Sequence, residues 1–416
     1  MTAATMTAGG LMLAGATPAS ADTIDYPPDR VVKPGPSGVN SAVGLAARAD
    51  GTLYVADGGP GFDRIWIIKR TATGHRPSAR AIQGANAGLD EVVDVGLDAR
   101  GQVYAATADG RVSVFGAGAF GNVAPIRVFA TGGPATGMAV SSAGEVAIGR
   151  AAGDEVVVFA PGSIGTPAPT RTIKGPKTGL EEGLQELEYD GTGRLWVLAD
   201  GNLLGFAAAA TGDVAPANKA RPLRTGRFEF AKADDLAVDH RNRLFLSFSH
   251  EESETKAYSS VAAYPAGAQG EVDPLRVLEG TRSRLETIDA ATALTVDRRG
   301  DVAVTGHPRS DVLVFRTFFP VRPTAVRSVT VSGKPRAVKR TVRWKQPADD
   351  GGRDVRSYKL VFRKGSKTLK TVALKPGRRS YKVAKSALRR GSLTVTVRAK
   401  TAKGWSPKVV KRFRVR

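Results

Sequence analysis

The chain has 416 residues, a net charge of +22 and no cysteine. This length leaves room for a second unit beside one ordinary domain, and the lack of cysteine excludes a disulfide framework, a thiolate metal site and a cysteine nucleophile. The charge is uneven: residues 321–416 contain 30 Lys and Arg against three acids, whereas residues 1–320 contain 31 against 36. The positive excess therefore belongs entirely to the last quarter of the chain.

The first 21 residues have features of an export signal. Small and apolar residues fill positions 8–16, and Ala19-Ser-Ala21 before Asp22 has the small-x-small form of a signal peptidase site. No Lys or Arg precedes the apolar stretch, so either the true start lies upstream of Met1 or the segment is not a signal. We expect residues 1–21 to be a signal peptide and the protein to be secreted or associated with the cell envelope. No later apolar stretch is long enough to predict a membrane span.

Two short patterns alternate six times between residues 28 and 315. The first is a proline closely followed by an arginine that leads into an apolar run: Pro28/Arg30, Pro77/Arg80, Pro125/Arg127, Pro169/Arg171, Pro222/Arg224 and Pro274/Arg276. The second is a tight turn followed by an alternating apolar strand, with turn residues Gly51, Gly101, Gly144, Gly193, Asn242 and Gly300. Short strands repeated about every 50 residues are typical of radial or solenoid arrays, in which no unit can bury its own apolar face.

Each of the six units is predicted to contain four strands, which gives a six-bladed β-propeller within an all-β chain. The first strand ends before the turn and the second follows it. The third strands are expected at residues 64–68, 112–115, 156–159, 203–206, 261–264 and 312–315. Because proline suits a strand that lacks a neighbour on one side, the proline-arginine strand should be the outer one.

The order of strands along the chain predicts how the ring closes. An arginine strand at residues 28–32 precedes any inner strand, and the last repeat ends at Phe315 without one. We therefore expect the N-terminal strand to complete the sixth blade and to cover an edge that would otherwise be open. The propeller should span residues 22–320.

The repeats resemble the NHL-type six-bladed propellers, whose phrase is a glycine-containing turn, a Leu-Tyr-Val strand and an aspartate. The copy most similar to it is Asp50-Gly-Thr-Leu-Tyr-Val-Ala-Asp57, and only this repeat keeps the final aspartate. The resemblance implies a binding platform, as in many members, or an enzyme, as in the related gluconolactonases and virginiamycin B lyase. The fold alone does not decide between these functions.

Three carboxylates are candidates for a site on the propeller axis. When the turns are aligned, the residue seven positions before each turn is Gly44, Asp94, Gly137, Glu186, Asp235 or Ala293. These positions begin the innermost strands, so Asp94, Glu186 and Asp235 are expected to converge. Three carboxylates suit Ca²⁺ or another hard cation. The favoured interpretation is that these acids satisfy backbone N–H groups or arginines, with no cofactor required.

The four histidines show no zinc-like spacing. His75 and His240 are expected in outer loops or turns, whereas His250 and His307 follow second strands and could approach one face. A His/Asp pair there would serve as acid and base, as virginiamycin B lyase uses histidine. The favoured interpretation is four surface histidines. No serine nucleophile elbow is present, and the glycine-rich pieces are loops that no helix follows.

Residues 321–416 are predicted to form a small antiparallel sandwich. Seven short alternating runs occupy residues 328–331, 340–344, 357–362, 368–372, 380–383, 393–398 and 409–413. The segment resembles a fibronectin type III domain in the order of Trp344-Lys-Gln-Pro347, Asp349-Asp-Gly-Gly352, Tyr358 and Gly404-Trp-Ser-Pro407. Leu393 stands where that family usually has a tyrosine, so we expect a looser corner there.

The cations of this segment alternate with apolar residues, which predicts that they lie together on the outer face of the sheets. Arg340, Arg343 and Lys345 are one such group. The residues expected to bind a polyanion are Arg378, Arg379, Arg389, Arg390, Lys411 and Arg412. Cell-envelope polymers or anionic lipid are favoured over nucleic acid, because export separates the chain from cytosolic nucleic acid and no base-stacking pattern appears.

The sequence therefore favours an exported, non-enzymatic interaction scaffold with an unidentified ligand or protein at the propeller face. Its basic C-terminal domain would contact an anionic surface or polymer. The alternative is a metal-dependent hydrolase or lyase of the gluconolactonase or virginiamycin B lyase type, with its site in the channel.

Overall fold

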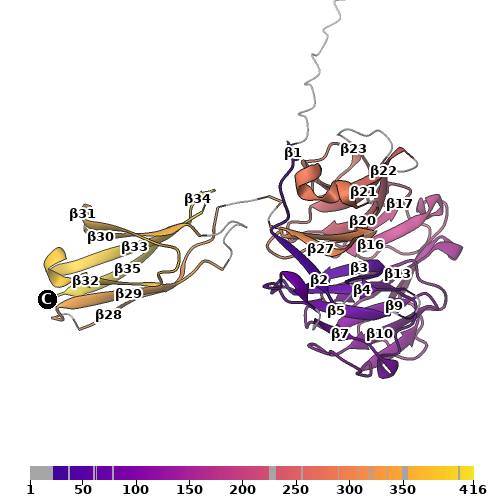
Figure 1. Ribbon diagram of the computed structural model, residues 1–416, viewed down its shortest axis with the longest axis horizontal. Coiled ribbons are helices and arrows are strands. Elements are labelled where there is room, and N and C mark those ends of the chain that lie inside the picture. The colour runs from indigo at the N-terminus through magenta and orange to yellow at the C-terminus, as the bar shows by residue number, and fades with distance from the viewer. Residues whose placement is uncertain are drawn as a thin grey trace, which may run out of the picture.

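The structure is a computed structural model (Figure 1). It describes residues 22–35, 38–59, 61, 63–76, 79–223, 231–253, 256–288, 290–307, 309–316, 318–319, 322–334, 336–348, 355–401 and 403–416. The expected signal segment, Arg224 and the acids Asp349, Asp350 and Asp354 lie outside these residues. Among the described residues, no helix is long and apolar enough to cross a membrane.

The described chain is built from strands, and those between residues 22 and 315 form six sheets in a propeller-like ring (Figure 1). The first three sheets are β3 (Ala42–Ala47), β4 (Leu53–Asp57), β5 (Arg64–Ile68) and β7 (Arg80–Ile82); β8 (Val92–Leu97), β9 (Val103–Thr107), β10 (Arg111–Phe115) and β11 (Arg127–Ala130); and β12 (Gly137–Val140), β13 (Val146–Arg150), β14 (Glu155–Phe159) and β15 (Arg171–Lys174). Within each sheet these strands are antiparallel neighbours.

The other three sheets each gain a fifth, parallel strand. They are β16 (Leu184–Tyr189), β17 (Leu195–Ala199), β18 (Asn202–Phe206), β19 (Asn218–Pro222) and β23 (Gly270–Val272); β20 (Ala231–Val238), β21 (Leu244–Ser253), β22 (Lys256–Tyr264), β24 (Arg276–Leu278) and β1 (Asp22–Ile24); and β25 (Ala290–Val296), β26 (Val302–His307), β27 (Arg309–Phe315), β2 (Arg30–Pro34) and β6 (Gly74–Arg76). Short 3-10 helices connect strands at Ala85–Ala87 (η1), Ala151–Gly153 (η2), Leu180–Glu182 (η3), Thr281–Ser283 (η4) and Leu285–Thr287 (η5).

The ring is closed at both its inner and its outer edge. The innermost strands are neighbours in the order β3, β8, β12, β16, β20, β25 and again β3. At the outer edge, each outer strand pairs in parallel with the segment that enters the next outer strand. The N-terminal strand takes part in this closure, because β2 pairs antiparallel with β27 at Arg30↔Val314 and Val32↔Val312.

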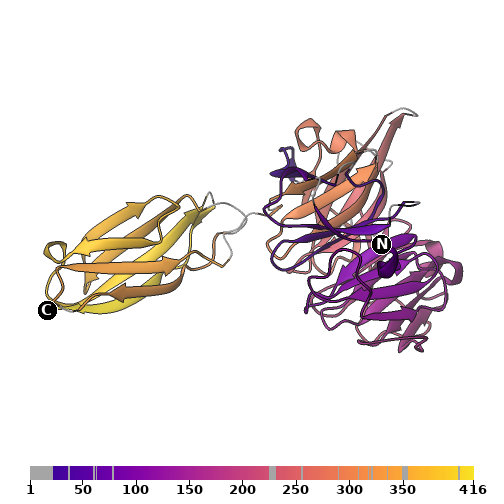
Figure 2. The ribbon, with the colours of Figure 1, turned by 60° about the horizontal axis from the view of Figure 1, so that its bottom comes forward.

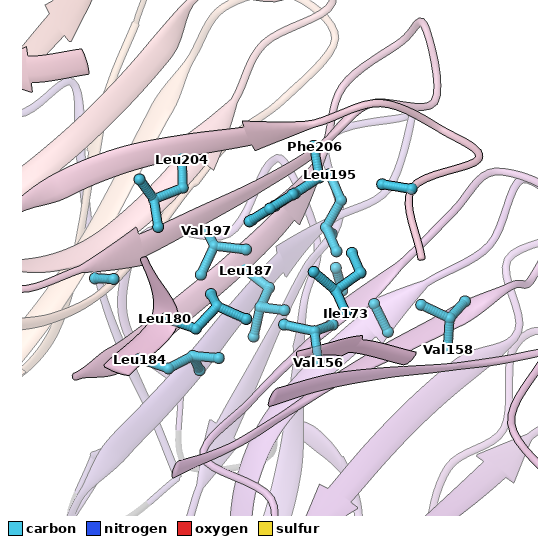
Figure 3. Close-up of a cluster of buried hydrophobic side chains, with 14 of the residues drawn as sticks. Val156, Val158, Ile173, Leu180, Leu184, Leu187, Leu195, Val197, Leu204 and Phe206 are labelled. Carbon is cyan, nitrogen blue, oxygen red and sulfur yellow. The ribbon is translucent and has the colours of Figure 1, made fainter. Parts of the chain in front are cut away.

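Each sheet buries its apolar faces against its two neighbours. One cluster of buried side chains lies between each neighbouring pair of sheets in the ring. Figure 3 shows the cluster between the third and fourth sheets, where Val156 and Ile173 face Leu187, Val197 and Phe206. No sheet has a core of its own, which is the behaviour expected of a repeat array.

The strand predictions agree with the observed elements, with one exception in the fourth sheet. Each predicted third strand lies within β5, β10, β14, β18, β22 or β27. Pro222/Arg224, however, is out of register with the other proline-arginine pairs, because Pro222 ends β19. Asn218 occupies the register position that Arg127 and Arg171 hold elsewhere, and it follows Pro216. The prediction that Pro222 and Arg224 mark the start of an outer strand was therefore wrong.

The C-terminal unit consists of two sheets, which appear as two layers in Figure 2. One sheet contains β28 (Arg327–Ser332), β29 (Lys339–Lys345) and β32 (Ser380–Ala384); the other contains β31 (Lys367–Leu374), β30 (Ser357–Lys364), β33 (Gly391–Thr401), β34 (Gly404–Trp405) and β35 (Val409–Val415), with η6 (Lys385–Ala387) between β32 and β33. Trp344 and Tyr358 lie in the buried core with their rings 5.5 Å apart. All seven predicted runs coincide with strands of this unit.

Candidate functional site

The three predicted channel acids stand at a shared irregularity of the inner strands. In five of the six sheets the pairing of the inner strand shifts at its start, and the first residue after the shift is Gly44, Asp94, Glu186, Asp235 or Ala293. A shift of this kind redirects the following side chain. The aligned positions in the sequence therefore correspond to equivalent places around the axis.

Two of these acids connect their own sheet to the next one. The backbone N–H of Met138 donates to Asp94 Oδ2 at 3.0 Å, and the N–H of Val95 donates to Asp94 Oδ1 at 2.7 Å. The N–H groups of Leu294 and Leu236 donate to Asp235 in the same way. Glu186 accepts only the adjacent N–H of Leu187, at 2.9 Å, among the contacts of the described residues.

Glycines at two of the other equivalent positions make room for the acids. A Cβ added to Gly44 would clash with Oδ1 of Asp94, and one added to Gly137 would lie 3.3 Å from Oε1 of Glu186. The acids thus fill space that the glycines leave on the neighbouring inner strand. This arrangement indicates a structural role for the carboxylates in joining adjacent sheets.

A cavity of about 180 Å³ lies on the axis and is lined by the innermost strands. Its lining includes Asp94, Glu186 and Asp235, together with a fourth carboxylate, Glu188, that the sequence analysis missed. Glu188 is two residues beyond Glu186, so the period-2 alternation of β16 places both on one face. That spacing was the signal by which it could have been found.

Burial raises the pKa of every one of these carboxyl groups. The pKa of Asp94 rises to about 7 and that of Glu188 to about 8, because desolvation disfavours the charged forms. The pKa values of Glu186 and Asp235 also lie well above their usual range, for the same reason and through the nearby carboxylate of Asp94. Neither a cation nor a histidine lines the cavity among the described residues. A cluster of this kind holds protons at neutral pH.

The described residues contain no set of three or more His, Cys, Asp or Glu side chains arranged to hold a metal ion. His75 Nε2 lies 2.9 Å from the carbonyl oxygen of Gly35, in the outer region that was predicted for it. His250, in contrast, is buried, with Nε2 2.8 Å from Ser260 Oγ and its ring stacked on Tyr258. The interpretation of His250 as a surface residue was wrong.

For Arg340, Arg343 and Lys345 in the C-terminal unit, the prediction of an exposed side chain is correct for two residues and wrong for one. Arg343 and Lys345 are exposed, but Arg340 is buried and donates to the carbonyl oxygen of Arg414. Its position has the parity of the buried Val342 and Trp344, so the prediction of an exposed Arg340 was wrong. Arg379, one of the predicted polyanion-binding residues, lies 4.8 Å from the ring of Tyr358 and donates to Gln346 at 3.0 Å.

The predicted polyanion-binding residues do not form one patch. Arg378 and Arg379 precede β32, whose first residue pairs with Arg343, whereas the last residue of β32 pairs with Lys339. Arg389 and Arg390 follow that last residue and precede β33, so they lie at the opposite end of the unit. Lys411 and Arg412 are consecutive in β35 and emerge on opposite faces, although both are exposed.

The strand pairing instead brings cationic residues together at the end of the C-terminal unit that carries the C-terminus, which is marked in Figure 2. The loop between β28 and β29, the β30–β31 hairpin, the η6 segment and the end of β35 all meet there, as the strand pairing requires. We call this the cationic end: Lys334, Arg336, Lys339, Lys364, Lys367, Lys385, Arg389, Arg390, Arg414 and Arg416. None of these side chains forms an ion pair with a described residue.

Some cations elsewhere in the unit lie over aromatic rings. The side-chain charges of Lys359, Arg398 and Lys400 lie 5.5–5.9 Å from the centre of the Trp405 ring. Arg379 covers Tyr358 in a similar way. Such contacts stabilise the cation where it stands. The cationic end has no counterpart to them among the described residues.

No family model matches the sequence, and no curated protein matches it. Among solved structures, similarity is found to YCF48 bound to a D1 peptide, at 11% identity over 71% of this chain and 99% of that chain, with a TM-score of 0.45. Two structures of the extracellular domain of BT4673 from B. thetaiotaomicron are 12% and 13% identical, cover 91% of this chain and have TM-scores of 0.36 and 0.38. The aligned region spans 57% and 56% of those two chains.

Proposed function

We propose that this protein is an exported, non-enzymatic binding scaffold. In this account the ring of six sheets is an NHL-type six-bladed propeller over residues 22–320, and residues 321–416 are a fibronectin type III domain that holds the molecule on an anionic polymer or surface. An unidentified ligand or protein binds the propeller face.

The observation that carries the proposal is the charge of the cationic end. Ten Lys and Arg side chains meet there, no acid is found among the described residues of this end, and residues 321–416 as a whole contain 30 Lys and Arg against three acids. A surface that has cations without acids attracts polyanions, because binding releases the counterions of the polymer.

The channel acids support the scaffold over the hydrolase or lyase. Asp94 and Asp235 use both oxygens for backbone N–H groups, two of which belong to the next sheet. Carboxylates committed in this way hold the ring together and are poorly placed to bind a cation. Millimolar Ca²⁺ should therefore leave the melting temperature unchanged, whereas a marked rise would favour the metal-dependent alternative.

Binding to dextran sulfate and to vesicles of phosphatidylglycerol and phosphatidylcholine tests the proposal. The chain lacking its signal should bind both, and a chain that ends at residue 319 should bind neither, because its net charge is negative. If the protein contacts about six phosphate or sulfate groups, its affinity should fall about a thousandfold when the salt concentration rises from about 50 to 200 mM. Equal binding by both chains, or binding that does not respond to salt, would contradict the proposal.

A further inference from the structure

A second cavity, of about 550 Å³, lies beside the first sheet of the ring. Arg48, Tyr54, Arg76, Arg80 and Phe120 are among its lining residues, and no Asp or Glu is found among the described residues that line it. The volume falls within the range of small-molecule sites, and the lining combines cations with exposed apolar surface. Phe120 is 51% exposed.

The six-fold repeat shows that the first sheet differs from the others at two positions. Three residues before the turn, the other sheets have Asp98, Ser141, Asp190, Asp239 and Asp297, whereas the first has Arg48. One residue after the turn, they have Gln102, Glu145, Arg194, Arg243 and Asp301, whereas the first has Thr52. Each of the other pairs includes at least one acid. The pair in the first sheet includes none.

In the four other sheets whose outer strand has this arginine, its side chain has a hydrogen-bond or ion-pair partner. Arg127 donates to Gln102 Oε1 at 3.1 Å, and Arg171 donates to Glu145 Oε1 at 2.6 Å. In the fifth and sixth sheets, Arg276 pairs with Asp22 and Arg30 donates to the carbonyl oxygen of Ala72 at 3.1 Å.

Arg80 occupies the same register, but no described residue provides an acceptor for it. It aligns with Tyr54 across β5, as Arg127 aligns with Tyr104 across β10. Its guanidinium makes no hydrogen bond or ion pair with a described residue, and lies 4.2 Å from the ring of Phe120. Thr52 is too short to serve as Gln102 and Glu145 do. Asp50 forms an ion pair with Arg48, and the hydrogen bond from Arg48 lowers the pKa of Asp50 to about 2.

We propose that this cavity binds an organic carboxylate. The carboxylate of the ligand accepts a charge-assisted hydrogen bond from Arg80, as Gln102 and Glu145 accept from the equivalent arginines. Arg76 adds a second positive charge near the carboxylate. The apolar body of the ligand lies against the exposed ring of Phe120. The site is independent of the cationic end, since it belongs to the ring.

Calorimetric titration of the full chain with phthalate tests this site, with benzamide as an uncharged ring compound and inorganic phosphate as an anion without a ring. Saturable binding of phthalate is expected. Arg80→Gln should weaken it about tenfold or more, because a hydrogen bond to a charged group is lost. Thr52→Glu should abolish it while the melting temperature stays the same or rises, because the new carboxylate reproduces the Glu145–Arg171 pair.

Arg127→Gln is the matched control, since it removes the same charge from a position whose acceptor is built in. It should change the affinity for phthalate less than about twofold. Three results would overturn the proposal. They are no saturable binding of phthalate by the unaltered chain, equal affinity of Arg80→Gln and Arg127→Gln for phthalate, or binding of phosphate as tight as that of phthalate.

Discussion

At the scale of single residues, the channel carboxyls combine burial with backbone hydrogen bonds. Aligning the turns was sufficient to predict Asp94, Glu186 and Asp235 as equivalent positions, because the repeat fixes where each inner strand begins. It did not reveal that Asp94 and Asp235 accept N–H groups from the next sheet, since those bonds depend on the angle between sheets. The prediction of an exposed Arg340 was wrong because Arg340 lies on the same face of β29 as the buried Val342 and Trp344.

Glu188 should make the protein less stable as the pH rises. Its pKa is 4.5 when unperturbed and about 8 in the folded chain, so between these values the folded state binds more protons than the unfolded state. The free energy of unfolding therefore falls as the pH increases through this range. Glu188→Gln removes the effect and should stabilise the protein by about 1–3 kcal/mol at pH 8 but little at pH 4.

Chemical denaturation of both proteins across this pH range checks that prediction. A difference in unfolding free energy that is the same at pH 4 and pH 8 would show that folding does not raise the pKa of Glu188.

At the scale of elements, the sequence specified the strands well because each has its own turn and its own apolar alternation. The turn residues have positive φ, as at Gly51 (84°) and Asn242 (61°), which the hairpin requires. The outer strand of the fourth sheet was harder to assign, because Asn218 replaces the arginine that marks the others. The parallel links between sheets leave no pattern in the sequence, and only the hydrogen bonds of the structure reveal them.

The N-terminal strand should be essential to the ring. Val32 in β2 is fully buried between the sixth and first sheets, whereas its neighbour Lys33 is partly exposed. Val32→Asp should destabilise the protein by about 3 kcal/mol or more, because it buries an unpaired charge and removes apolar packing.

Lys33→Asp provides the matched control and should change the stability by less than about 1 kcal/mol. Melting temperatures of the two variants decide the matter. If they melt together, β2 contributes little to closure of the ring.

At the scale of the whole molecule, the fold of the C-terminal unit determines where its positive charge is concentrated. Composition alone located the positive charge after residue 320, but not its distribution within the unit. The cations of the cationic end come from loops far apart in the sequence, and only the strand order of the two sheets brings these loops to one end. That is why the residues predicted for polyanion binding mix both ends, and only Arg389 and Arg390 among them belong to the cationic end.

A matched pair of charge reversals tests the central claim most directly. One variant combines Lys364→Glu, Arg389→Glu and Arg390→Glu at the cationic end, and the other combines Lys375→Glu, Arg378→Glu and Lys403→Glu near the opposite end. Both have the same net charge, and all six side chains are exposed. We expect the first to weaken binding to dextran sulfate at least about tenfold more than the second, with both folded. Equal loss in the two variants would show that net charge alone attracts the polymer and would contradict a binding surface at the cationic end.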